Sequence, residues 1–126
     1  TYNKNIFLEG YFAGSKVSMM LGKPSGFTLQ ALEETIIINL NFKKYKVLIA
    51  GRPDFKDFYI AYLEKNWVID KEEREISLVM DTATTRYLKL LQRHPGIDKR
   101  IPLQHIASHL GITPIQLSRI RKTLKK

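Results

Sequence analysis

The chain has 126 residues, of which 44% are hydrophobic, and it carries a formal net charge of +9 at pH 7. This composition excludes an intrinsically disordered chain and fits one folded domain or two small ones. The absence of cysteine excludes disulfides, thiolate metal sites and cysteine nucleophiles, and it fits a cytoplasmic protein.

The first part of the chain predicts short β-strands separated by glycine turns. Strand-forming residues are frequent in residues 1–12, and residues 27–40 end in the β-branched run Ile36, Ile37 and Ile38. Between them, residues 17–21 fit a single helical turn. The apolar spacing of residues 42–49 predicts a short amphipathic helix. Together these patterns favour a small antiparallel β structure over residues 1–53.

A long helix is predicted from residue 54 to residue 80, because apolar residues recur there and no glycine or proline interrupts them. Asp54 can cap its start. A rod of this length, roughly 40 Å, has more apolar surface than a small β unit can cover. We therefore expect it to pair with a second copy in the manner of a coiled coil. The alternative is packing against the protein's own sheet.

Asp81 and Thr82 are predicted to form a hinge and to cap the next helix, since either side chain can accept hydrogen bonds from the amides of the following turn. That helix is expected to reach about His94. The side chains that we expect it to bury are Tyr87, Leu88, Leu90 and Leu91. Residues 95–96, Pro-Gly, end it, and residues 96–101 are expected to form a short loop or hairpin.

The sequence from residue 103 to residue 122 predicts a helix-turn-helix. The first helix has apolar residues at the spacing of one buried face, and Gly111 suits the left-handed backbone of its C-cap. Thr113 can cap the second helix, and Pro114 occupies a position where no backbone donor is lost. Small Ala107 permits the two helices to approach closely. The second helix of such a motif enters the DNA major groove.

The basic charge lies at the same end of the chain. Residues 1–85 hold as many acidic as basic residues, whereas residues 86–126 hold ten Lys and Arg against the single acid Asp98. A neutral body with a basic end is typical of a nucleic-acid-binding protein. An ordinary helical hairpin in a core is the alternative, but the outward face of the second helix carries donors and positive charge. An acidic membrane surface is a weaker alternative, because the apolar stripes are needed for packing.

Other constellations give no support for catalysis or metal binding. His105 and His109 lie four residues apart on one helix, but no cysteine or carboxylate is near in sequence to complete a metal site. Residues 22–25 only faintly resemble a phosphate-binding loop. The neighbouring acids Glu33 and Glu34 would point to opposite faces of a strand. We expect no enzyme activity, no cofactor and no metal. The apolar runs are too short to span a membrane, and no signal peptide precedes them.

The order of these elements resembles that of the Crp/Fnr family of bacterial transcription regulators. The likeness rests on RYLKLL at residues 86–91, IASHLGITP at 106–114 and LSRIR at 117–121, and it is greatest for Bacteroidetes-type members. GYFAGS at residues 10–15 and FKKY at 42–45 resemble the second half of the family's cyclic-nucleotide-binding β-roll and the helix after it. The resemblance thus implies that the N-terminal part of the protein is missing.

The resemblance implies an α+β fold with three parts: a partial antiparallel β-roll sensor over residues 1–53, a dimerisation helix over 54–80 and a winged helix-turn-helix over 81–126. It implies a homodimer that binds a palindromic operator in double-stranded DNA, with RNA polymerase as a further candidate partner. Arg119 matches the family's base-reading arginine, whereas Ile115 replaces its usual glutamate. The predicted DNA-binding residues are Thr113, Gln116, Ser118, Arg119, Arg121 and Lys122.

The resemblance places an effector pocket at Gly14, Ser15, Ser25 and Gly26, which stand where cyclic-AMP-binding members have a glutamate and an arginine-serine pair. A buried phosphate would here lack its charged partner, so we expect that cyclic AMP is not the effector. We therefore expect a transcription regulator with a degenerate sensor and an unknown small-molecule effector, if it has one. The alternative is a non-enzymatic ligand-binding or protein-interaction module with a basic C-terminal face.

Overall fold

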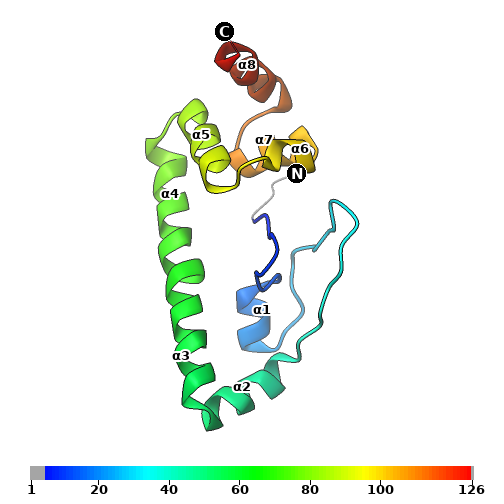
Figure 1. The fold of residues 1–126 in the computed structure, drawn as a ribbon, viewed down its shortest axis with the longest axis vertical. Coiled ribbons are helices and arrows are strands. Elements are labelled where there is room, and N and C mark those ends of the chain that lie inside the picture. Colours follow the sequence, from blue (N-terminus) through cyan, green and yellow to red (C-terminus); the bar gives the residue numbers. More distant parts are fainter. Residues whose placement is uncertain (1–4, 126) are drawn as a thin grey trace.

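The structure is a computed structural model that describes residues 5–125. Helices and connecting loops make up this part of the chain (Figure 1). The helices are α1 (Lys16–Leu21), α2 (Phe42–Gly51), α3 (Pro53–Tyr62), η1 (Leu63–Ile69), α4 (Asp70–Met80), α5 (Ala83–Arg93), α6 (Ile97–Arg100), α7 (Leu103–Leu110) and α8 (Pro114–Leu124).

A long rod of α3, η1 and α4 connects the two ends of the molecule (Figure 1). Pro53 stands at its first helical position and Asp54 in its first turn, where a negative charge favours the helix dipole. The middle segment, η1, is a π-helix, and the amide of Asp70 still bonds to the carbonyl of Lys65 at its end. The expected long helix over residues 54–80 is therefore confirmed.

None of the described helices is long and apolar enough to cross a membrane.

An aromatic cluster stabilises the lower end of the rod. Tyr45 and Ile49 of α2 are buried against Tyr59 of α3, and the rings of Tyr45 and Tyr59 meet edge to face with centroids 5.8 Å apart. The side chain of Asn41 starts α2 by accepting a hydrogen bond of 3.0 Å from the amide of Lys44. The expected helix over residues 42–49 is confirmed.

A second core lies at the other end, within α5 to α8. Eight buried side chains form it, and three of them, Ile106, Ala107 and Leu117, have no exposed surface. The remaining members are Tyr87, Leu90, Ile97, Ile101 and Leu110. Ile6 and Leu32, from the N-terminal part of the chain, pack against this core from outside. The C-terminal helices thus have their own hydrophobic centre, to which two distant segments attach.

The predicted α+β fold is wrong for the part of the chain that the structure describes. Residues 5–125 contain no strand, so they form neither the antiparallel β-roll expected over residues 1–53 nor the β wing of a winged helix-turn-helix. Residues 27–40 are irregular, and Ile36 and Ile38 are 96% and 91% exposed. A β-branched run favours a strand only where a neighbouring strand pairs its backbone groups, and no such neighbour lies beside it. The expected strand at residues 1–12 falls partly outside the described residues, and residues 5–12 are irregular, with a turn at Gly10.

Two smaller expectations are also corrected near the C-terminal helices. Residues 97–100 form the short helix α6 in place of the loop or hairpin expected over residues 96–101, with Gly96 in a left-handed conformation before it. In α5, Tyr87 and Leu90 are buried and Leu91 is half-buried, as expected, but Leu88 is 47% exposed. Adjacent residues of a helix point in different directions, so Leu88 faces away from the core in which Tyr87 is buried.

Candidate nucleic-acid interface

The turn between α7 and α8 has the backbone that the sequence predicts. Gly111 ends α7 with a φ of 73°, which only glycine adopts without steric cost. Thr113 Oγ1 accepts a hydrogen bond of 3.2 Å from the amide of Gln116, and Gln116 Oε1 accepts one of 2.9 Å from the amide of Thr113. This reciprocal capping box starts α8 at Pro114. The two helices of the predicted helix-turn-helix are confirmed with their caps.

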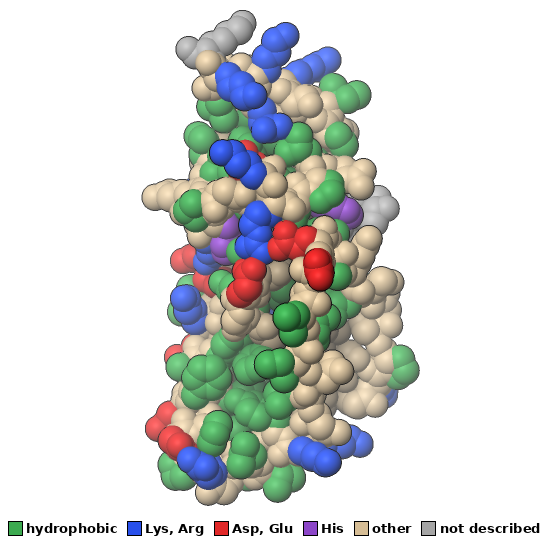
Figure 2. Space-filling view, turned by 45° about the vertical axis from the view of Figure 1, so that its right-hand side comes forward, with side chains coloured by type: hydrophobic (Ala, Val, Ile, Leu, Met, Phe, Trp, Pro, Cys, Tyr) green, Lys and Arg blue, Asp and Glu red, His purple; other side chains and the backbone are tan. Residues whose placement is uncertain are grey.

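The packing of α7 and α8 leaves one face of α8 open. Leu117 faces inward with no exposed surface, whereas Ile115, Ser118, Arg119 and Lys122 are exposed. Those four positions have the i, i+3, i+4, i+7 spacing of a single helix face. We call them the α8 stripe. Lys and Arg side chains gather at this end of the molecule (Figure 2).

The predicted DNA-binding residues fall into three groups. Ser118, Arg119 and Lys122 belong to the α8 stripe. Thr113 and Gln116 are exposed beside it, and their side chains are engaged in the capping box. Arg121 lies apart, because it is half-buried and its guanidinium is 3.8 Å from the carboxylate of Asp98 in α6. The structure thus brings the predicted residues together along α8, with Arg121 on a different side.

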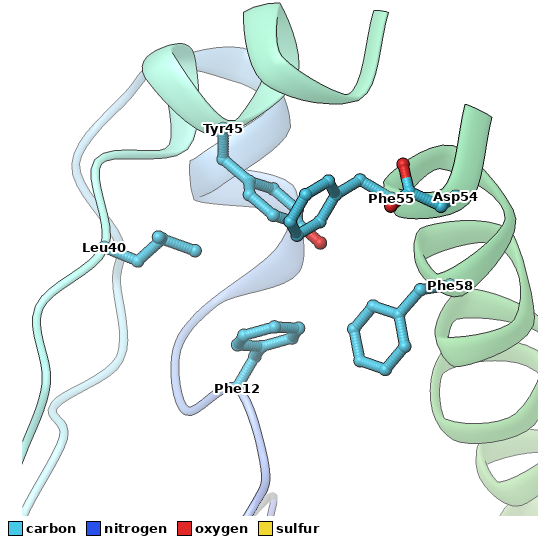
Figure 3. A pocket seen from close by; sticks show the side chains of 6 residues that line it. All are labelled: Phe12, Leu40, Tyr45, Asp54, Phe55 and Phe58. Atoms are coloured by element: carbon cyan, nitrogen blue, oxygen red, sulfur yellow. The ribbon is translucent and has the colours of Figure 1, made fainter. Parts of the chain in front are cut away.

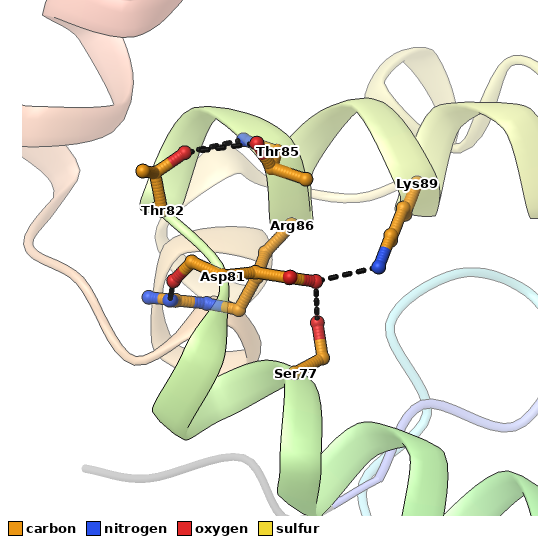
Figure 4. A network of polar contacts seen from close by, with 6 residues as sticks. All are labelled: Ser77, Asp81, Thr82, Thr85, Arg86 and Lys89. Carbon is orange, nitrogen blue, oxygen red and sulfur yellow. Dashed lines mark hydrogen bonds and ion pairs between the residues drawn. The ribbon is translucent and has the colours of Figure 1, made fainter.

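A polar network at the hinge holds this unit against α4 (Figure 4). Thr82 caps α5 by accepting from the amide of Thr85 at 3.2 Å, which confirms its predicted role. The Asp81 carboxylate accepts from the Ser77 hydroxyl at 2.5 Å and pairs with Lys89 at 2.6 Å. These partners, Lys89 first and then Ser77, keep the pKa of Asp81 below its usual value.

Two arginines bind the last carbonyls of α7, and the sequence reasoning missed both. Arg86 donates to the carbonyl of Leu110 from Nε at 3.1 Å and from Nη2 at 2.9 Å, and to the carbonyl of Asp81 from Nη1 at 2.7 Å. Arg74 of α4 donates to the carbonyl of His109 at 3.0 Å. Positive charge at a helix C-terminus interacts favourably with the helix dipole. The orientation of α7, and with it that of α8, is therefore tied to the rod.

Another arginine that the sequence reasoning missed is Arg100, at the end of α6. It forms ion pairs with Glu9, at 2.6 Å, and with Glu33. The pKa of Glu9 is held below its usual value, chiefly by the hydrogen bond from Arg100. In the sequence, Arg100 is marked only by being next to another basic residue, Lys99, just before α7.

The four residues predicted for an effector pocket lie in two turns, one before α1 and one after it. Ser15 caps the start of α1 by accepting from the amide of Ser18 at 3.3 Å, while Ser25 lies beyond the other end and accepts from the amide of Phe27 at 2.9 Å. Gly14 and Gly26 are their neighbours in sequence. Each serine thus stabilises its own turn.

An open aromatic hollow of about 390 Å³ lies between α2 and the start of α3 (Figure 3). None of the four predicted effector residues lines it. The lining residues are Phe12, Leu40, Tyr45, Asp54, Phe55 and Phe58. The Asp54 carboxylate at its rim is paired with Arg52 at 2.8 Å, so the hollow offers an almost purely apolar surface.

Among residues 5–125, no group of three or more His, Asp and Glu side chains is arranged to hold a metal ion, and this includes the surroundings of His105 and His109. Comparisons of the chain with models of known protein families, with curated proteins and with solved structures gave no match. The arrangement of α7 and α8 is therefore the feature from which a function can be argued.

Proposed function

We propose that the protein is a sequence-specific, DNA-binding transcription regulator that acts as a homodimer, as its resemblance to the Crp/Fnr family implies. The observation that carries the proposal is the capped α7–turn–α8 unit with the exposed α8 stripe. In a helix-turn-helix, the second helix enters the major groove and the first crosses the DNA backbone. The excess of positive charge after residue 86 supplies the attraction to phosphates.

Within this proposal, Arg119 reads a base and Lys122 binds phosphate. An arginine in the major groove can donate two hydrogen bonds to O6 and N7 of guanine, which no other base presents in that arrangement. Lysine acts on phosphates as a flexible point charge. Ile115, exposed on the same stripe, offers an apolar contact of the kind that thymine methyl groups accept.

The rod supports the homodimer in this proposal. Ile69, Ile76 and Val79 are 51%, 55% and 82% exposed and lie at positions that repeat along one side of the rod. An exposed apolar stripe of this length is typical of a surface that pairs with another helix. Two copies joined along their rods would present two α8 helices to a palindromic site.

Selection from a randomised duplex library tests the proposal. We expect enrichment of a palindrome with half-sites about one helical turn apart, and binding that weakens steeply with salt. Arg119→Ala should weaken binding to the selected site about 10- to 100-fold and relax the preference at one base pair. Arg52→Ala is the matched control, since it removes the same charge from an exposed arginine at the start of the rod, and it should bind as wild type does.

Equal, salt-sensitive binding of every duplex by wild type and Arg119→Ala alike would contradict the proposal. The alternative function, a ligand-binding or protein-interaction module with a basic face, would then gain support. It is favoured by the exposed apolar side chains of residues 36–40, which a partner protein could cover. Figure 2 shows hydrophobic side chains gathered on the lower half of the face that it presents.

A further inference from the structure

We propose that Arg100 is a phosphate-binding arginine of the DNA interface, and that Glu9 and Glu33 occupy it in the DNA-free protein, so that the two carboxylates compete with DNA. This inference rests on the proposed function. It adds a residue outside the α8 stripe and a contact through which the N-terminal part of the chain opposes DNA binding.

The contacts around Arg100 imitate those that a phosphate would make. Nη1 and Nη2 donate to the two carboxylate oxygens of Glu9 at 3.3 and 2.6 Å, and Nη2 also donates to Glu33. A guanidinium binds carboxylates and phosphates through the same fork of parallel N–H groups. The donors that Arg100 would offer to a phosphate are therefore taken by acidic oxygens of the same charge and geometry.

The position of Arg100 places it beside the DNA-binding helices. It is the last residue of α6, and α7 begins three residues later at Leu103. The same short helix contacts α8 through the ion pair of Asp98 with Arg121. Because the first helix of a helix-turn-helix crosses the DNA backbone, a basic residue at the entry to α7 lies near the path of the phosphates.

Apolar contacts of two partly buried side chains hold the two acids at this position. Ile6, three residues before Glu9, and Leu32, next to Glu33, both pack against the core of the C-terminal helices. The carboxylates are thus tethered beside Arg100, which raises their effective concentration above that of free anions. An isolated surface ion pair, by contrast, contributes little.

The ion pairs are nevertheless accessible to a competitor. The side chains of Arg100, Glu33 and Glu9 are 38%, 41% and 77% exposed. A phosphate group could therefore approach the guanidinium as the carboxylates leave, without first unfolding the core. Residues 86–126 hold a single acid, Asp98, so Glu9 and Glu33 bring to this surface negative charge from elsewhere in the chain.

A double-mutant cycle on binding to the selected duplex tests the inference. The four proteins are wild type, Glu9→Gln/Glu33→Gln, Arg100→Ala and the triple variant. We expect Arg100→Ala to bind as wild type does, because in wild type any contact of Arg100 with a phosphate replaces its contacts with Glu9 and Glu33. Glu9→Gln/Glu33→Gln should bind roughly tenfold more tightly, since a charged hydrogen bond to phosphate becomes available. Its affinity should also fall more steeply with salt concentration, by the amount expected for about one additional phosphate contact. The triple variant should lose this gain.

Glu34→Gln/Glu64→Gln is the matched control, because it removes the same charge from two exposed acids that have no contact with Arg100. It should bind DNA as wild type does.

A gain that persists in the triple variant, or that the control reproduces, would show that the acids act by general repulsion and would overturn the inference. So would equal affinity of Glu9→Gln/Glu33→Gln and wild type. If none of the four proteins bound duplex DNA even at low salt, the proposed function would fail and the inference with it. Thermal unfolding of all four verifies that each is folded.

Discussion

At the level of single residues, Arg86 connects the end of α7 to the end of the rod. Its three donors bind two carbonyls, one at the end of α4 and one at the end of α7. These carbonyls belong to helix ends, where no intrahelical amide remains to bond with them. Only a guanidinium supplies donors in the directions required.

We expect Arg86→Lys to lower the free energy of unfolding by about 2 kcal/mol, although it keeps the charge, because one ammonium group cannot reach both carbonyls. Denaturant unfolding measures the loss. Lys89→Met is the control: its pair with Asp81 lies at the surface, so its effect should be clearly smaller. Equal stability of Arg86→Lys and wild type would mean that the three hydrogen bonds are not needed.

At the level of elements, the start of α8 is specified by residues that are neighbours in the sequence. Thr113 and Gln116 bond to each other's amides, and Pro114 has a backbone angle suited to the first turn. Leu117 then fixes the rotation of α8 by entering the core, which leaves Arg119 exposed. The cap and the core residue together decide which side chains α8 presents.

Thr113→Ala should destabilise the protein by about 1 kcal/mol, since it removes the acceptor for the amide of Gln116. Thr113→Ser keeps the hydroxyl and should unfold at nearly the wild-type temperature. Thermal unfolding compares the three proteins. If the serine variant were as unstable as the alanine variant, the threonine methyl group, and not the cap, would be responsible.

At the level of the whole molecule, the described residues expose much apolar surface. The two cores lie at opposite ends of the rod, and the side chains between them are only partly covered. Exposed apolar stripes along a rod favour association between copies. Dimerisation would also fix the distance between two α8 helices.

We expect Ile76→Glu to weaken the proposed dimer by roughly 100-fold, because a charge would be buried without a partner in the proposed interface. The monomer should keep its fold, since Ile76 is 55% exposed there. Sedimentation equilibrium gives the dissociation constant. Val47→Glu, at a 75% exposed position on α2, is the control and should remain dimeric. A monomeric wild-type protein would contradict the proposed pairing.

The sequence by itself determined the elements that depend on residues close together in the chain. The helices of the helix-turn-helix could be predicted in detail because their ends are set by local residues: Gly111 ends α7, and Thr113 and Pro114 start α8. The rod could be predicted because an uninterrupted apolar pattern is a local property. The outward orientation of Arg119 followed from its distance from Leu117 along one helix.

Only the tertiary structure decided the features that depend on residues far apart. The β-branched residues 36–38 indicate a strand, but a strand needs a partner elsewhere in the chain, and the described residues offer none. Arg100 meets Glu9 across 91 positions and Glu33 across 67. Arg86 reaches Leu110 across 24. Local conformational preferences depend on neighbouring residues, whereas these long-range contacts form only once packing has brought separate segments together.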